Sequence, residues 1–414
     1  MTISVFGLGF VGLTTALGFA HNGNKVYGID VNKEKRDIIS NGDIPFFEPQ
    51  MKEILQQTLN KNFFVTENIN KAVAESDCIF YCVGTPYGQN GCADLSFLFK
   101  AIDSAMQEIN DDKYRVLVVK STIPPSTTSE KIVPYVKQNY SRLVAQTGIA
   151  NNPEFLREGH CWDDFINADR IVLGCDDDKT AKVLSELYKD FNLPIIVVSH
   201  NTGEFIKYLS NTLLATMISY SNEMSLVADQ IGNINVSDAF KILHMDKRWN
   251  SCNMKSYVYP GCGYGGYCLP KDTNALYAQA KAKGYEPKIL KNVIDLNENM
   301  PFNIAKKIIN KINDTDKIGI LGLSFKPFTD DVRDAPAAKV ISALISEGYK
   351  NISAFDPVAN SEFKKHYAFN IDYKNSIAEL YENCDIAVIL TEWPEFKSIQ
   401  SLGSKRIVDC RYML

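Results

Sequence analysis

The residue with the clearest chemical potential in this sequence is Cys268, which lies in the stretch GCGYGGYCLPKDT at residues 261–273. The glycines before it would let the backbone approach a ligand closely, and Lys271 follows, where an ammonium group favours the reactive thiolate. Three interpretations compete: a structural thiol, a metal ligand and a nucleophile. No cysteine or histidine companions stand at zinc-ligand spacing, so we predict no metal site. Because core cysteines lie among apolar residues, this glycine-rich, charged setting favours the nucleophile.

The first 30 residues carry the pattern of a dinucleotide-binding turn. A strand is followed by Gly7-x-Gly9-x-x-Gly12 at the start of a small-residue helix, and a second strand ends in Asp30. In this context the glycines allow a tight turn, close approach to a pyrophosphate and close helix packing, and the acid accepts hydrogen bonds from a ribose diol. Asp30 would repel a 2′-phosphate, so the pattern favours NAD over NADP. Three nearby basic residues could soften that preference: Lys33, Lys35 and Arg36.

A nucleophilic cysteine has a specific use in an enzyme that oxidises alcohols with NAD. Its thiolate adds to an aldehyde, the thiohemiacetal loses a hydride to become a thioester, and water releases an acid. Lys207 and Asn211 stand four positions apart in an apolar helical run, so they would share one face; a structural salt bridge is the alternative for Lys207. Asp272 follows Cys268 by four positions, one turn away if a helix starts at Pro270.

Alternating strands and helices must place these groups at the edges of sheets. Residues 77–86 and 115–125 each read as a strand that breaks in a turn, and Thr85 and Thr122 lie in those turns. Ligands of open parallel sheets bind beyond the carboxyl ends of strands. Both threonines are therefore candidate ligand contacts, with simple turn formation as the alternative.

Two acids follow in the segment NNPEFLREG. On a helical turn Glu154 and Glu158 would share a face, with Arg157 between them. A solvated surface turn is the alternative, although Asn151-Asn152-Pro153 in front of them indicates a shaped loop.

The last third of the chain repeats the order of the first. A strand with a glycine turn, a strand that ends in Asp356 and later strands echo the N-terminal units, and residues 203–231 between them form a long, largely apolar helix. Such a helix is buried within a protein or between subunits. We predict an α/β fold: two Rossmann-like doubly wound domains joined by a long central helix and a small helical domain. The boundaries are 1–200 for NAD binding, 201–300 for the central helical, dimerisation and cysteine-loop domain, and 301–414 for a second nucleotide-binding domain.

Composition excludes several classes of partner. The chain has 414 residues and a net charge of −5 without a basic run, which argues against nucleic acid. No uncharged apolar run approaches the length of a membrane span, and the N-terminus lacks a secretion signal. Ten cysteines without such a signal indicate mostly free thiols in a reducing compartment, so we expect a cytoplasmic protein.

Taken together, these motifs resemble the UDP-glucose/GDP-mannose dehydrogenase family over nearly the whole chain. The matching stretches, in order, are VFGLGFVGLTTALGFA, VGTPYG, KSTIPPST, NPEFLREG, EFIKYLSNTLLATMISYSNE, YGGYCLPKDT, GLSFKPFTDDVRDAP and TEWPEF. The YGGYCLPKD stretch is the most specific of them. The resemblance implies that UDP-glucose, two NAD and water give UDP-glucuronate and two NADH, with residues 301–414 binding the UDP-sugar and a homodimer formed through the central helix.

The resemblance also implies roles for individual residues. Cys268 would be the nucleophile, and Lys207 and Asn211 would hold the C6 oxygen and stabilise the oxyanion. Asp272 and Thr122 would position a water that relays protons, and Glu154 would act as acid or base around thioester hydrolysis.

The implied contacts fall into two groups. Those around NAD are Gly7, Gly9, Phe10, Val11, Gly12, Asp30, Lys35, Thr85, Thr122, Glu158 and Arg333. Those around the UDP-sugar are Glu154, Phe155, Leu156, Arg157, Lys207, Asn211, Arg248, Tyr259, Gly261, Gly263, Tyr264, Gly265, Cys268, Phe325, Lys326 and Arg411.

One departure from the family pattern bears on the substrate. The family usually has an arginine about 16 residues before the cysteine, which reaches into the neighbouring subunit's site, whereas Arg248 stands 20 residues before Cys268. The longer loop leaves another nucleotide sugar, such as a UDP-N-acetylhexosamine or GDP-mannose, as an alternative substrate. Two further alternatives are a two-electron hydroxyacid dehydrogenase, which needs neither Cys268 nor a second α/β domain, and a non-catalytic nucleotide-sugar sensor, which would usually have lost its catalytic residues.

Overall fold

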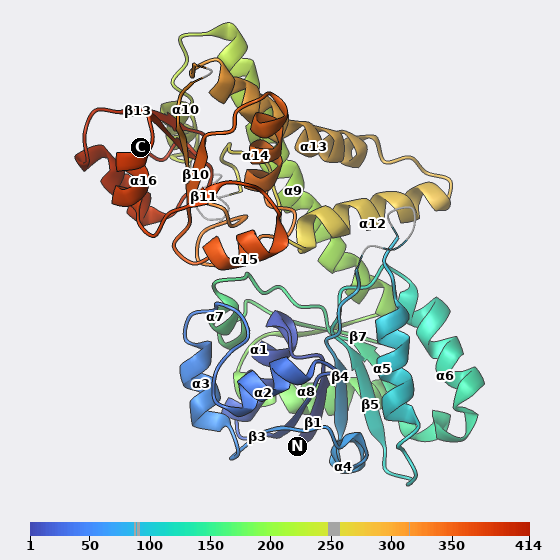
Figure 1. The fold of residues 1–414 in the computed structure, drawn as a ribbon. Coiled ribbons are helices and arrows are strands. Elements are labelled where there is room, and N and C mark those ends of the chain that lie inside the picture. Colours follow the sequence, from blue (N-terminus) through green and yellow to red (C-terminus); the bar gives the residue numbers. More distant parts are fainter. Residues whose placement is uncertain (87, 89–91, 247–256, 314) are drawn as a thin grey trace. The chain divides into compact units, whose positions relative to one another are not determined.

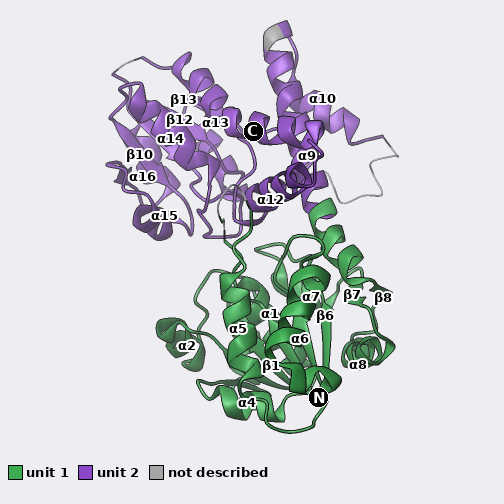
Figure 2. Cartoon of the chain, turned by 90° about the vertical axis from the view of Figure 1, so that its right-hand side faces the viewer, with its two compact units in different colours: residues 1–209 green, residues 210–414 purple. Residues whose placement is uncertain are grey.

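Eight strands of the first 209 residues form one sheet with the order β3-β2-β1-β4-β5-β6-β7-β8. The computed structural model describes residues 1–86, 88, 92–246, 257–313 and 315–414, and it divides into unit 1 (Met1–Leu209) and unit 2 (Ser210–Leu414) (Figures 1 and 2). Neighbouring strands of this sheet run parallel except β6 and β7. The first six strands thus have the order of a dinucleotide-binding Rossmann fold.

Strands and helices alternate along most of the chain in unit 1. The strands are β1 (Thr2–Phe6), β2 (Lys25–Ile29), β3 (Phe63–Val65), β4 (Cys78–Tyr81), β5 (Arg115–Val119), β6 (Thr147–Asn151), β7 (Ile171–Cys175) and β8 (Ile195–Val198). The helices are α1 (Phe10–His21), α2 (Lys33–Ser40), α3 (Met51–Thr58), α4 (Ile69–Glu75), α5 (Ser96–Met106), α6 (Val133–Asn139), α7 (Cys161–Ile166) and α8 (Asp178–Tyr188).

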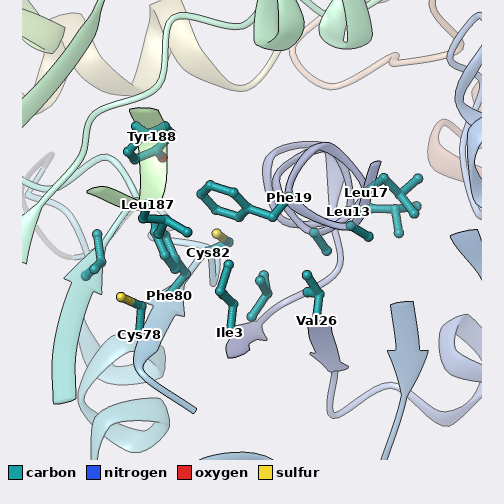
Figure 3. Packing of buried hydrophobic residues seen from close by; sticks show 14 of the residues in the cluster. Ile3, Leu13, Leu17, Phe19, Val26, Cys78, Phe80, Cys82, Leu187 and Tyr188 are labelled. Carbon is teal, nitrogen blue, oxygen red and sulfur yellow. The ribbon is translucent and has the colours of Figure 1, made fainter. Parts of the chain in front are cut away.

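The core of unit 1 lies on both faces of this sheet because successive strand residues point to opposite faces. In β4, Phe80 packs under α1 and α8, whereas Ile79 packs under the helices on the other face. Figure 3 shows Phe19 of α1 between Phe80 and Tyr188, with ring centroids 5.1 and 5.2 Å away. Burial raises the pKa of the Cys82 thiol, just after β4, to about 12, as expected of an inert core cysteine.

Unit 2 contains a five-stranded parallel sheet with the order β11-β10-β9-β12-β13. Its strands are β9 (Ile318–Leu321), β10 (Ile352–Phe355), β11 (Asp372–Tyr373), β12 (Ile386–Ile389) and β13 (Arg406–Asp409). Its helices are α10 (Val236–Leu243), α12 (Cys268–Ala282), α13 (Lys288–Ile309), α14 (Pro336–Ser346), α15 (Asn360–His366) and α16 (Ile377–Asn383). The long helix α9 (His200–Ile231) belongs to both units and links them in the chain. Because both units combine a largely parallel sheet with helices, the predicted α/β class is confirmed.

The glycine turns of the two sheets are built alike. The amide of Leu8, after β1, donates to Asp30 Oδ2 at 2.8 Å, and the amide of Leu323, after β9, donates to Asp356 Oδ2 at 2.8 Å. Asp356 also accepts from Ser324 and Trp393, and it is 2% exposed. The acid of the second turn is therefore occupied by protein donors, whereas a dinucleotide site needs that acid for a ribose.

The structure decides two conditions that the sequence left open. Residues 152–157 form an irregular segment and not a helical turn, so Glu154 and Glu158 are not on one helical face. Helix α12 begins at Cys268 itself, two residues before Pro270. A proline fits there because the first turn of a helix leaves its N–H groups without intrahelical partners. Within the described residues, no helix is long and apolar enough to cross a membrane.

Candidate active site

The turn after β1 has the geometry that a dinucleotide pyrophosphate requires. Gly7 has φ of +91°, which is strained for any side chain, and a Cβ at Gly12 would lie 1.7 Å from the Gly7 carbonyl oxygen. A Cβ at Gly9 would meet nothing within 4 Å, so the backbone there is open to a ligand. Phe10 and Val11 form the first turn of α1, whose free N–H groups favour an anion. The residues present therefore fit NAD.

Asp30 follows the carboxyl end of β2, and neighbouring groups hold its carboxylate in place. Its Oδ2 accepts from the Leu8 amide and lies 3.1 Å from Lys35 Nζ. Arg36 donates to the Asp30 carbonyl at 2.6 Å, while Lys33 pairs with Asp37 instead. Two of the three basic residues predicted near Asp30 thus contact it.

Thr85 and Thr122, which follow the adjacent strands β4 and β5, are brought together. The Thr85 hydroxyl donates to the Thr122 carbonyl at 2.8 Å, and Thr85 is buried. The carboxyl ends of β1, β2, β4 and β5 therefore gather the glycine turn, Asp30 and both threonines at one edge of the unit 1 sheet, where Rossmann folds bind ligands.

Glu154 and Lys207 form a buried ion pair in unit 1. Glu154 Oε1 lies 2.8 Å from Lys207 Nζ, and each side chain is 6% exposed. The other oxygen, Oε2, accepts from the Leu156 amide at 2.7 Å. The Phe155 ring stacks under the Arg170 guanidinium at 4.2 Å, with Lys207 Nζ 5.8 Å from its centroid. A carboxylate and an ammonium so placed can exchange a proton with a bound substrate.

Arg157, a predicted neighbour of this pair, is directed toward another acid. Arg157 makes a two-pronged contact with Asp164, at 2.9 Å from Nε and 2.6 Å from Nη2. Glu158 lies in the turn that follows the irregular segment.

Asp272 is the centre of a buried polar cluster in unit 2. Its Oδ2 accepts from Asn211 Nδ2 at 2.7 Å, and its Oδ1 lies 2.5 Å from Lys271 Nζ. Asp272 is fully buried, Lys271 is 2% exposed and Asn211 is 6% exposed. Helix α9 thus carries one member of each buried cluster, Lys207 and Asn211, one turn apart.

Cys268 is half-buried at the first residue of α12, where the helix dipole favours a thiolate. The preceding residue, Tyr267, packs under the Arg333 guanidinium at 4.6 Å, and Arg333 in turn pairs with Asp331 at 2.5 Å. A Cβ at Gly266, where φ is +78°, would lie 2.9 Å from the Phe325 ring. Arg333 and Phe325, both predicted ligand contacts, therefore shape the loop that ends at Cys268.

Buried asparagines fix the glycine loop before Cys268. Asn297 of α13 accepts from the Tyr264 amide at 2.7 Å and donates to its carbonyl at 3.0 Å, and Asn222 accepts from the Gly261 amide at 2.6 Å. The loop also packs too closely for side chains, since a Cβ at Gly263 would lie 2.9 Å from Asn297 and one at Gly265 would lie 2.5 Å from a carbonyl oxygen. These contacts hold the loop in one shape.

The remaining predicted substrate residues of unit 2 contact the glycine loop, the last residues of the chain or Phe325. A Cβ at Gly261 would clash with the Arg411 guanidinium, which pairs with Glu392, and burial lowers the pKa of Arg411. Tyr259 donates to the Tyr412 carbonyl at 2.9 Å, and Lys326 lies 5.5 Å from the Phe325 ring centroid. Arg248 falls within 247–256, outside the described residues.

Several residues that support the site were not singled out from the sequence. They are Lys120, Asn222, Asn297, Asp331 and Glu392. Of these, only Lys120 carried a local signal, a charge that directly follows the apolar strand VLVV. Across the described part of the chain, no group of three or more metal-ligating side chains is present.

Comparisons with known proteins give one family for the entire chain. Models of the UDP-glucose/GDP-mannose dehydrogenase family match residues 1–192 as the NAD binding domain, 201–299 as the central domain and 319–414 as the UDP binding domain. UDP-glucose 6-dehydrogenase TuaD of Bacillus subtilis is 34% identical over 98% of this chain and 87% of its own.

Two solved structures are also similar. A UDP-glucose dehydrogenase from Pyrobaculum islandicum has a TM-score of 0.92 and 33% identity, and it covers 99% of this chain and 94% of its own. A UDP-D-ManNAc dehydrogenase from Pyrococcus horikoshii has a TM-score of 0.85 and 29% identity, over 100% of this chain and 96% of its own.

Proposed function

Because the chain belongs to the UDP-glucose/GDP-mannose dehydrogenase family and uses NAD, we propose that it oxidises C6 of UDP-glucose to the carboxylate of UDP-glucuronate with the reduction of two NAD. The observation that carries this proposal is the position of Cys268 at the start of α12, one turn before the buried Asp272. A two-electron alcohol dehydrogenase would need no nucleophile there. The names of the relatives, UDP-glucose 6-dehydrogenase and UDP-glucose dehydrogenase, support the same substrate.

The proposed reaction proceeds in three stages that balance atoms and charge. The C6 alcohol loses a hydride and a proton and becomes an aldehyde. The Cys268 thiolate adds to the aldehyde carbon, and the thiohemiacetal loses a second hydride to become a thioester. Water then attacks the thioester: one of its protons goes to Glu154 and the other to the departing sulfur, the C–S bond breaks and a carboxylate is released. The thiol and Glu154 lose these protons to solvent before the next turnover. Bound NAD supplies the acceptor for each hydride.

The residues of the two clusters have matching tasks in this scheme. Lys207 and Asn211 hold the C6 oxygen and stabilise the negative charge that develops on it. Glu154 takes the proton from the attacking water. Thr122 and Asp272 hold the water through which protons leave. The glycine loop at residues 259–265, with Phe325, Lys326 and Arg411, holds the UDP-sugar.

The sharpest rival is the same chemistry on another nucleotide sugar, which the similarity to a UDP-D-ManNAc dehydrogenase supports. We expect the purified protein to produce two NADH for each UDP-glucose consumed and to turn over UDP-N-acetylhexosamines and GDP-mannose much more slowly. The measurement is NADH absorbance against substrate consumed, across that panel of sugars. No turnover of UDP-glucose would refute the substrate, and one NADH per sugar would refute the four-electron reaction.

A homodimer through α9 forms the second part of the proposal. The exposed apolar side chains of this helix follow one stripe along its length: Phe205, Leu209, Leu213, Tyr220, Val227 and Ile231. Exposed apolar surfaces of this length are typical of protein interfaces.

A cytoplasmic location is the third part of the proposal. None of the nine described cysteines forms a disulfide, which supports a reducing, cytoplasmic location.

Leu213→Glu should convert the dimer to a monomer, because the charge would lose its hydration at the centre of the stripe. We expect the dissociation constant to rise about 100-fold or more, which light scattering with size-exclusion chromatography would measure. Phe97→Glu, at an exposed phenylalanine at the start of α5, is the matched control. A Leu213→Glu protein that remains dimeric would place the interface elsewhere.

A further inference from the structure

Lys120 is a buried lysine next to the Glu154–Lys207 pair. It directly follows β5, is 4% exposed, and its Nζ donates to Asn152 Oδ1 at 2.8 Å. No carboxylate of the described chain lies at ion-pair distance from it, so its direct partner is a neutral amide. A buried ammonium is costly unless its charge is used or compensated.

The side-chain amide of Asn152, which Lys120 holds, has two further hydrogen-bond partners and lies two residues before Glu154. Asn152 Oδ1 also accepts from the Tyr188 hydroxyl at 2.6 Å, and Asn152 Nδ2 donates to the Val172 carbonyl at 2.8 Å. Asn152 is two residues before Glu154 in an irregular segment with no helix or strand to fix it. The position of Glu154 therefore depends on the anchoring of Asn152.

Charged and titratable groups surround Lys120 from each element packed against it. Burial lowers the pKa of Lys120 to about 8; Cys82, after β4, and Glu154, after β6, raise it, and Lys207 of α9 lowers it further. Tyr188 of α8 contributes its neutral hydroxyl, and the Phe165 ring of α7 lies 5.8 Å from Nζ. Glu154 is thus the acidic group that interacts with two buried ammonium groups.

We propose that Lys120 is a positioning residue for Glu154: its hydrogen bond to Asn152 fixes the Asn152–Glu154 segment, and its buried positive charge interacts with the Glu154 side chain. This rests on the role of Glu154 in the proposed function. In the proposed function Lys207 pairs with Glu154 and also holds the C6 oxygen of the substrate. In that scheme Lys120 provides a second positive charge beside Glu154 that has no contact with the substrate.

The test separates the charge of Lys120 from its hydrogen bond. Lys120→Met should move the acidic limb of the kcat pH profile toward alkaline pH, because the site loses a buried positive charge. Tyr188→Phe removes the other donor to Asn152 Oδ1 without changing charge, so it should leave that limb in place. Lys120→Arg, which stays charged, should also keep it. A Lys120→Met profile that coincides with the unsubstituted enzyme, or an equal shift in Tyr188→Phe, would overturn the proposal.

A second measurement needs neither substrate nor Lys120→Met. In protein labelled with 15N-lysine, the Lys120 amine, assigned by its absence in Lys120→Arg, should titrate about half a pH unit or more lower in Glu154→Gln. An unchanged titration would refute the coupling. The pH profile can be recorded with whichever nucleotide sugar the enzyme oxidises, so an error in the UDP-glucose assignment leaves both measurements decisive.

Discussion

Cys268→Ser should abolish the four-electron oxidation of the nucleotide sugar, with a loss in kcat of at least ~1,000-fold. Serine preserves the size of the side chain and the start of α12, but its hydroxyl does not ionise near neutral pH as a thiol at a helix N-terminus can. Without a thiolate no thioester forms. The measurement is carboxylate product and NADH formed per enzyme over time.

The controls for this variant separate chemistry from folding. Cys92→Ser changes an exposed thiol outside the site and should retain full activity. The unfolding temperature of Cys268→Ser should match that of the unsubstituted protein, because Cys268 is only half-buried. If Cys268→Ser still delivered two NADH per sugar at a normal rate, the nucleophile role would be wrong.

The fold was predictable where the sequence carries strong periodicity and turn residues. The strand–glycine turn–helix at residues 2–21 and the apolar helix α9 both occur where expected. Three strands were not predicted: β3, β6 and β11. Strand β6 reads TGIAN, with one large aliphatic residue, and β11 has two residues. They lie in these sheets because neighbouring strands supply their hydrogen bonds, a tertiary effect that no local pattern contains.

The candidate site was predictable as residue types but not as contacts. Spacing placed Lys207 and Asn211 on one face of a helix, yet their acidic partners lie 53 residues before Lys207 and 61 after Asn211. Asn151-Asn152-Pro153 indicated a shaped loop before Glu154, but the sequence alone could not reveal that Lys120 and Tyr188 anchor Asn152. Arrangements that depend on distant partners become visible only in three dimensions.

Asp272→Asn should lower both stability and activity, because one carboxylate serves two buried donors. Lys271 and Asn211 contact different oxygens of Asp272, and an asparagine would replace one of these oxygens with an NH2 group, so one of the two donors would face another donor. Lys271 would be left as a buried ammonium without an anion. We expect the free energy of unfolding to fall by about 3 kcal/mol, measured by urea titration, and kcat to fall by at least about 100-fold.

Two further variants show which interaction of Asp272 is responsible for the loss of stability and which for the loss of activity. Asp295→Asn removes an aspartate from an exposed ion pair with Lys291 on α13 and should leave stability nearly unchanged, since solvent screens such pairs. Lys271→Met combined with Asp272→Asn removes both charges, so it should regain much of the lost stability. The double variant should remain inactive, because the carboxylate proposed to hold the water is still missing. An Asp272→Asn protein as stable and as active as Asp295→Asn would show that the buried cluster has neither role.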